Sequence, residues 1–142
     1  MNARTATAVA RPPVLATQAQ TRIVSHLCEW EQGSGLRSAV LASVDGFALA
    51  QASAEAGSGD HLAAMTSAML GLAGAVSREL KLGAMDVLIL EAVAGKVLML
   101  RLDAKPVPLL LMAGCDRDCL TGNVLWSAKE CGRKILAELG NR

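Results

Sequence analysis

A long stretch without charge constrains this chain more than any other feature. Between Asp60 and Arg78 the sequence HLAAMTSAMLGLAGAVS contains no Asp, Glu, Lys or Arg. A surface helix of a globular protein normally carries charged side chains on the side that faces away from the core. We therefore expect Leu62 to Ser77 to form a helix that is buried on more than one side.

A helical wheel at about 100° per residue divides this helix into two faces. One face is bulky and is expected to cover a sheet; it holds Leu62, Met65, Met69, Leu72 and Val76. The opposite face holds small residues, namely Ala64, Ser67, Ala68, Gly71, Gly74 and Ala75. The alternative to a second buried face is a helix that is merely rich in alanine and half exposed.

The two glycines of the small face favour contact with another helix. Each glycine inside a helix costs about 1 kcal/mol relative to alanine, and the close approach of a second helix offsets such a cost. The simplest second helix is that of another copy of the chain, related by a two-fold axis. We therefore predict self-association through this face.

Turn and cap residues divide the rest of the chain into elements. The Asp45-Gly46 pair predicts a hairpin with a type I′ turn, in which both central residues have positive φ, and Asp60 is expected to cap the central helix. The predicted elements are a helix at Val14–Gln32, a hairpin at Leu36–Gln51, a loop at Ala52–Gly59, a helix from Asp60 to Leu82 that stops at Gly83, strands at Met85–Ala92, Lys96–Leu102 and Val107–Ala113, and a helix at Asp118–Leu139.

This order predicts an α+β fold. The last three strands are apolar at consecutive positions, which is typical of strands that are covered on both faces. Five antiparallel strands with helices on both faces make a three-layer sandwich, in the order α-β-β-α-β-β-β-α. We expect residues 14–142 to form this single domain after a flexible tail at residues 1–13.

The strand Met85–Ala92 extends the prediction about self-association. If this strand lies at an edge of the sheet, its apolar backbone invites pairing with a second copy. The predicted dimer interface is therefore made of Ala64, Ser67, Ala68, Gly71, Gly74, Ala75, Arg78, Val87 and Ile89.

Composition excludes several functional classes. Hydrophobic residues make up 52% of the chain, which suffices for a core, whereas aromatic residues make up only 2% and the net charge is +1. Nucleic-acid binding is therefore not expected, because it relies on basic surfaces and stacking aromatics. No apolar run approaches the ~20 residues of a membrane span, and the N-terminus lacks the apolar core of a secretory signal. We expect a cytoplasmic protein with reduced thiols.

Few residue groups indicate chemistry. Gly95-Lys96 lacks both the earlier glycine and the following Ser or Thr of a phosphate-binding loop. Cys115 and Cys119, in GCDRDC, have a spacing that suits two metal ligands, but a second pair is not obvious, since His26 and His61 each stand alone. The simpler interpretation is a turn with small buried thiols. We expect no catalytic residues and no cofactor.

The combination of elements resembles the roadblock/dynein light chain family, and in particular its bacterial members. The resemblance covers residues 14–140 and lies in the hairpin GLRSAVLASVDGFALAQAS, the helix from Asp60, the strand pair LGAMDVLILEAVAGKVLMLRL, the strand PLLLMAG and the terminal helix. It implies a dimer whose sheet continues across the interface with the central helices side by side. Bacterial members of the family regulate Ras-like GTPases, and other members are scaffold subunits. The four cysteines depart from the family pattern.

Three hypotheses follow. The first is a non-catalytic dimeric subunit that regulates or scaffolds a small Ras-like GTPase. The second is a metal- or ligand-sensing module on the same fold that uses the turn of Cys115 and Cys119. The third is a thiol enzyme, which requires a cysteine of lowered pKa.

Overall fold

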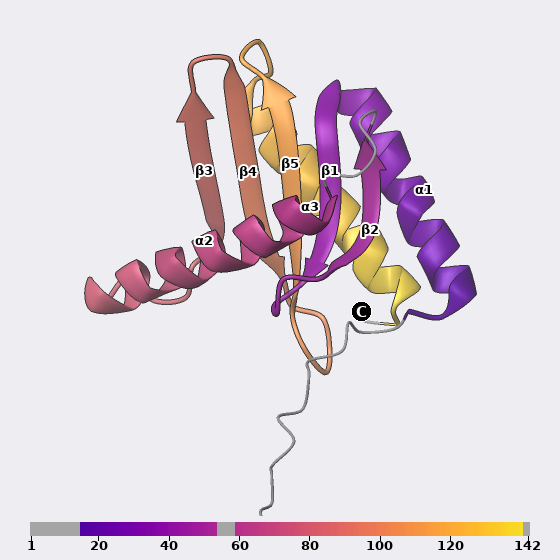
Figure 1. The fold of residues 1–142 in the computed structure, drawn as a ribbon, viewed down its shortest axis with the longest axis horizontal. Coiled ribbons are helices and arrows are strands. Elements are labelled where there is room, and N and C mark those ends of the chain that lie inside the picture. Colours follow the sequence, from indigo (N-terminus) through magenta and orange to yellow (C-terminus); the bar gives the residue numbers. More distant parts are fainter. Residues whose placement is uncertain (1–14, 54–58, 141–142) are drawn as a thin grey trace, which may run out of the picture.

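The chain folds around one antiparallel sheet with helices on both faces. A computed structural model describes residues 15–53 and 59–140. The sheet has five strands in the order β2-β1-β5-β4-β3, so that β2 and β3 lie at its edges. Figure 1 shows α2 crossing one face while α1 and α3 cover the other. This architecture confirms the predicted α+β sandwich and the predicted order of elements. The predicted tail lies outside the described residues.

The elements match the predicted ones apart from their ends. They are α1 (Thr17–Ser34), β1 (Leu36–Ser43), β2 (Ala48–Ser53), α2 (Gly59–Glu79), β3 (Val87–Ala92), β4 (Gly95–Leu102), β5 (Leu109–Asp116) and α3 (Thr121–Glu138). Residues 52 and 53, predicted as loop, belong to β2, and residues 54–58 lie outside the described part. Every neighbouring pair of strands is antiparallel.

Alternation along the strands builds two cores, one on each face of the sheet. Toward α1 and α3, Leu41 and Leu111 are fully buried together with Ile23 and Leu27 of α1 and Ile135 of α3. Toward α2, a smaller core contains Val40, Ala42, Ala63, Leu70, Met99, Leu110 and Met112. Successive strand residues point to opposite faces, so the consecutive apolar runs of β1, β4 and β5 supply both cores.

Helices α1 and α3 pack against each other as well as against the sheet. The indole Nε1 of Trp30 donates a hydrogen bond to Ser127 Oγ at 2.8 Å, and His26 Nε2 lies 3.3 Å from Glu138 Oε1. Helix α1 is followed by Gly35, whose φ of 64° places it in the left-handed region, a conformation common just after the end of a helix and favoured by glycine. These contacts fix the helical layer on one side of the sheet.

The turn between β1 and β2 differs from the prediction. Of its two central residues only Gly46 has a positive φ, at 92°, so the turn is not type I′. Residues 44–47 form a four-residue loop in which the Ser43 amide donates to the Phe47 carbonyl at 2.9 Å and the Gly46 amide donates to the Ser43 carbonyl at 3.0 Å. The hydroxyl of Ser43 accepts a further bond from the Phe47 amide. This side-chain bond stabilises the longer loop.

Both ends of α2 also differ from the prediction. The helix begins at Gly59, so Asp60 lies within the first turn and is not the cap. Its carboxylate there still interacts favourably with the positive end of the helix dipole. It ends at Glu79, because Lys81 takes a φ of 57°. The Lys81 and Leu82 amides then donate to the carbonyls of Arg78 and Ser77, the pattern of a Schellman motif. The predicted stop at Gly83 is therefore late.

Candidate partner-binding surface

The side of α2 that packs on the sheet is made mostly of small and polar residues, with Leu70 as the large apolar one. Ala63, Thr66, Leu70 and Ser77 are buried there. The two hydroxyls are satisfied locally, since Thr66 Oγ1 donates to the Leu62 carbonyl at 2.7 Å and Ser77 Oγ donates to the Gly83 carbonyl at 2.6 Å. The prediction that the bulky face covers the sheet is wrong for three of its five residues. Small side chains let the helix lie close to the strands, and the larger ones turn outward.

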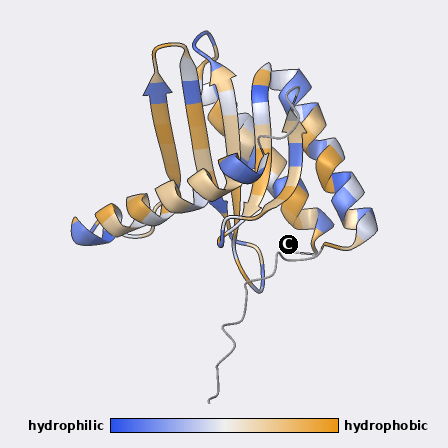
Figure 2. Ribbon diagram, viewed as in Figure 1, coloured by the Kyte–Doolittle hydropathy of each residue, from blue (hydrophilic) through white to orange (hydrophobic). Residues whose placement is uncertain are grey.

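The outward side of α2, together with Leu80 just after its end, carries a stripe of large apolar residues. Met65, Leu72, Val76 and Leu80 are 57%, 70%, 57% and 63% exposed. Only Leu62 and Met69 of the predicted bulky face pack partly against the core. Figure 2 shows apolar colour along the middle of α2, with hydrophilic colour at both of its ends. Contiguous exposed apolar surface commonly marks an interaction site.

Strand β3 adds an open edge and exposed apolar side chains. Ile89 and Leu90 point to opposite faces and are 40% and 37% exposed. The strand pairs with β4 on one side, and no described strand pairs with its other side. The structure thus confirms that β3 is an edge strand and corrects the expectation that it is covered on both faces. Unpaired strand edges attract further strands.

The residues predicted for the dimer interface occupy several positions around this surface. Ala64, Ala68, Gly71, Ala75 and Arg78 are exposed on α2, Ser67 and Gly74 are half-buried, and in β3 Val87 is half-buried and Ile89 exposed. The role of these residues in an interface stays a prediction. Met65, Leu72 and Val76 are predicted from the sequence to lie on the sheet side, and their exposure is missed because a wheel of an uncharged helix shows two faces without showing which one meets the sheet.

Of the two predicted hairpin residues, Gly46 lies against α2 and Asp45 does not. Asp45 is exposed, whereas Gly46 lies against the helix, where an added Cβ would be 3.2 Å from the Cα of Ala64. The hydroxyl of Ser67 donates to the Val44 carbonyl in the same turn. The β1–β2 turn therefore anchors the N-terminal half of α2, and we define the outward side of α2 together with β3 as the α2–β3 surface.

The four cysteines are all free thiols. Cys115 is buried at the end of β5, and burial, reinforced by the neighbouring Cys119, raises its pKa to about 11. The Cys119 thiol faces the Ser34 and Gly35 carbonyls at 3.9 and 4.0 Å. Within residues 15–53 and 59–140, no three His, Cys, Asp or Glu side chains gather where they could hold a metal ion. A raised pKa also disfavours the thiolate that metal binding and nucleophilic attack both require.

The two histidines have separate surroundings. His26 lies between α1 and α3 next to Glu138, whose other oxygen Oε2 is 3.5 Å from Arg22 Nη1. His61 is exposed on α2. Arg22 and His26 of α1 thus link this helix to Glu138 of α3, which is a structural role.

Burial of the Cys131 thiol predicts a loss of stability at alkaline pH. Burial raises the pKa of Cys131 from 9.0 to about 12, so between these values the thiol ionises in the unfolded chain but not in the folded one. Stability then falls as pH rises, since the unfolded state binds fewer protons. From pH 8.5 to 10.5 the wild type is expected to lose about 2 kcal/mol more unfolding free energy than Cys131→Ala. The chain has no Tyr to titrate in this range.

Urea unfolding of both proteins at the two pH values measures this difference. The variant is expected to be less stable at pH 8.5, because it loses buried packing, and the gap is expected to narrow at pH 10.5. A stability gap that stays constant between the two pH values would contradict the raised pKa of Cys131.

Within the described residues, no helix is long and apolar enough to cross a membrane.

Comparison with known proteins places this architecture. The model of the Roadblock/LC7 domain matches residues 25–106, which is more than half of the chain. No curated protein matches the sequence. Among solved structures, the gliding protein MglB from Thermus thermophilus superposes with a TM-score of 0.80 at 20% identity, over 91% of this chain and 97% of that chain.

Two further structures give the same result. MglB from Myxococcus xanthus has a TM-score of 0.77 at 13% identity, over 90% of this chain and 95% of that one. A Roadblock/LC7 domain from Streptomyces avermitilis has a TM-score of 0.67 at 16% identity, over 89% and 98% of the two chains. At these identities the likeness shows the fold, while the domain model shows the family. The chain therefore belongs to the Roadblock/LC7 family, as its sequence resemblance predicts.

Proposed function

We propose that the chain is a non-catalytic regulatory or scaffolding subunit that forms a homodimer and binds a small Ras-like GTPase. The observation that supports the homodimer is the α2–β3 surface. It combines an apolar helix stripe with an open strand edge on one side of the molecule. Membership of the Roadblock/LC7 family, whose members are generally regulatory, supports the binding of a small Ras-like GTPase.

The geometry of the surface favours two-fold pairing. In Figure 1 the C-terminal end of α2 extends beyond β3, so a second copy placed with its β3 alongside receives that end over its own sheet. The same operation brings the two helix stripes together. A two-fold axis makes each contact occur twice, and it removes Leu72, Val76 and Leu90, which lies on the α2 side of β3, from water together. Each fully buried large apolar side chain contributes about 1.5–3 kcal/mol.

The GTPase part follows from the family alone, and its experiment is separate. A Ras-like GTPase encoded beside the gene for this chain is the first candidate, and we expect it to co-elute with the purified protein in size-exclusion chromatography. Single-turnover GTP hydrolysis and nucleotide release, measured with and without this chain, distinguish a regulator, which changes one of the two rates, from a scaffold, which changes neither. Failure to co-elute in both nucleotide states would end the GTPase proposal and leave the dimer proposal untouched.

A metal-sensing role at Cys115 and Cys119 has less support. The described residues offer these two thiols no further ligand, and the pKa of Cys115 is raised. We therefore place the protein's binding function on α2 and keep the cytoplasm as its expected location.

A further inference from the structure

A cavity lies along the flank of α2, beside the α2–β3 surface. Its volume is about 400 Å³, within the range of about 300–1,000 Å³ that is typical of small-molecule sites. Helix α2, the loop before β3, the β1–β2 turn and strands β4 and β5 contribute to its walls. The lining residues are Val44, Ser67, Leu70, Gly71, Gly74, Arg78, Gly83, Ala84, Met85, Arg101 and Leu110.

The two glycines inside α2 keep this cavity open. A Cβ added at Gly71 would meet no atom within 4 Å, and one at Gly74 would meet only Arg78 Nη1 at 3.6 Å. Packing within the protomer therefore does not require glycine at either position. Each glycine nevertheless costs the helix about 1 kcal/mol relative to alanine. The two glycines leave the cavity open although they destabilise the helix. This combination indicates that a bound molecule occupies the cavity.

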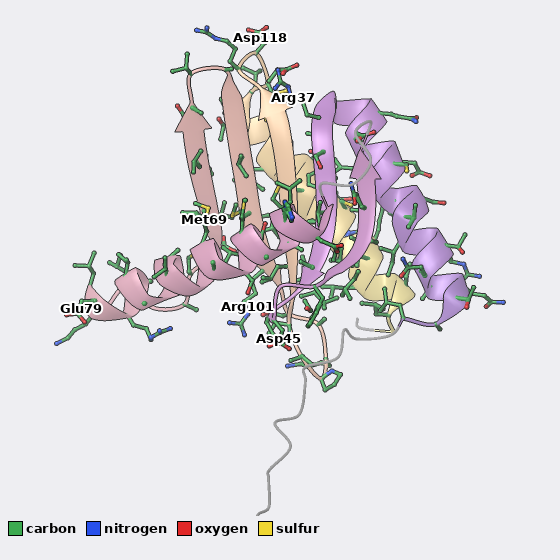
Figure 3. The ribbon with its side chains drawn as sticks, viewed as in Figure 1. Arg37, Asp45, Met69, Glu79, Arg101 and Asp118 are labelled. Carbon is green, nitrogen blue, oxygen red and sulfur yellow. The ribbon has the colours of Figure 1, made fainter. Side chains whose placement is uncertain are left out.

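Charge at the cavity has one sign. Arg78 and Arg101 both line it, and none of its lining residues is a carboxylate. Arg78 forms no ion pair with a described residue, and the Nε atom of Arg101 lies 3.8 Å from Oδ1 of the exposed Asp103. Figure 3 shows Arg101 below α2, at the end of the sheet opposite Asp118. The remaining walls are mainly aliphatic.

We infer that this cavity binds a small aliphatic carboxylate. Leu70, Met85 and Leu110 supply apolar walls for the body of the ligand, and the two guanidinium groups supply donors for its carboxylate, a pairing that Arg geometry favours. The ligand site is separate from the cysteine turn and does not depend on binding of a GTPase. Because α2 forms both this cavity and the α2–β3 surface, the protein has a direct physical link between ligand and partner.

Titration of the full-length protein with sodium octanoate, followed by ¹H–¹⁵N NMR, tests the inference. The amides of Gly71, Gly74 and Gly83 are expected to shift in a saturable way, whereas octan-1-ol, which has the same length but no charge, is expected to shift them at least tenfold more weakly at equal concentration. Hydrogen bonds to charged groups contribute about 1.5–3 kcal/mol, which corresponds to this factor. Equal amide shifts with octan-1-ol and octanoate, or no amide shifts with octanoate, would overturn the inference of a carboxylate site.

Variants locate the site. The double variant Arg78→Gln and Arg101→Gln is expected to bind octanoate at least tenfold more weakly. Asp103→Asn removes the carboxylate that lies 3.8 Å from Arg101 Nε and is expected to bind octanoate more tightly. Arg133→Gln serves as the matched control, because Arg133 pairs with Glu130 on α3 and is expected to leave binding unchanged. Unfolding midpoints confirm that each variant is folded. Equal affinity for the double variant and the control would contradict the proposal.

Discussion

Leu72→Glu is expected to convert the proposed dimer into a monomer. Leu72 is 70% exposed in the protomer and lies in the middle of the outward stripe of α2. A two-fold axis through this stripe places the new carboxylate in the interface twice, and an unpaired buried charge costs several kcal/mol. The dissociation constant is therefore expected to rise by at least a hundredfold, which corresponds to about 2.7 kcal/mol. Sedimentation equilibrium measures the change, and Ala68→Glu on the same side is expected to act alike.

Leu120→Glu is the matched control for this substitution. Leu120 is 67% exposed but precedes α3, on the other side of the sheet. The same chemical change at nearly the same exposure is expected to leave the dimer intact. Thermal unfolding of the isolated monomer of Leu72→Glu is expected to stay cooperative, because the substituted side chain makes few contacts within the protomer. A variant that remains dimeric at the wild-type dissociation constant would refute the placement of the interface on this stripe.

The sequence predicts the fold well because its turn and helix-end signals are local. Asp45-Gly46 and Ala94-Gly95 separate short apolar runs at hairpin distances, and Gly33-Ser34-Gly35 ends the first helix. These signals depend on neighbouring residues only, so they identify elements and antiparallel neighbours without knowledge of the rest of the molecule. The type of turn is harder, because the hydroxyl of Ser43 adds a hydrogen bond that lengthens the loop.

The orientation of α2 is not predictable in the same way. Both of its faces are uncharged, so hydrophobic periodicity gives no direction for the core. Larger side chains are the obvious choice for burial against a sheet, yet Ala63, Thr66 and Ser77 take that place. The proposed dimer explains this choice, because the larger residues then bury surface between copies.

Strand β3 shows a related limit. Its run of Val87, Leu88, Ile89 and Leu90 predicts cover on both faces, but the protomer leaves the last two exposed. The single chain alone does not explain this pattern, and the proposed dimer would cover part of this strand. The cavity beside α2 has no sequence signal at all, because its walls come from separate segments and its two arginines are 23 positions apart in the chain (101 minus 78).

Gly95→Ala is expected to destabilise the protein although the change is a single methyl group. A Cβ at Gly95 would lie 2.3 Å from the carbonyl oxygen of Cys115 and 3.6 Å from the Cα of Asp116. Both are backbone atoms of β5, so no side-chain rotation relieves the clash and the start of β4 must move away. Overpacking of this kind typically costs about 1–3 kcal/mol and occasionally more. The sequence marks Gly95 as a turn residue, whereas the structure gives the close approach of β5 as its reason.

Gly114→Ala provides the comparison within the same sheet. A Cβ at Gly114 of β5 would meet no atom within 4 Å, and alanine loses less backbone entropy on folding than glycine does. Urea midpoints are therefore expected to fall for Gly95→Ala and to stay level or rise for Gly114→Ala. Since β4 is the strand that holds β3 in the sheet, Gly95→Ala is also expected to weaken the proposed dimer, and Gly114→Ala is not. Equal midpoints for the two variants would show that the β4–β5 contact tolerates the added methyl group and that Gly95 serves only its hairpin.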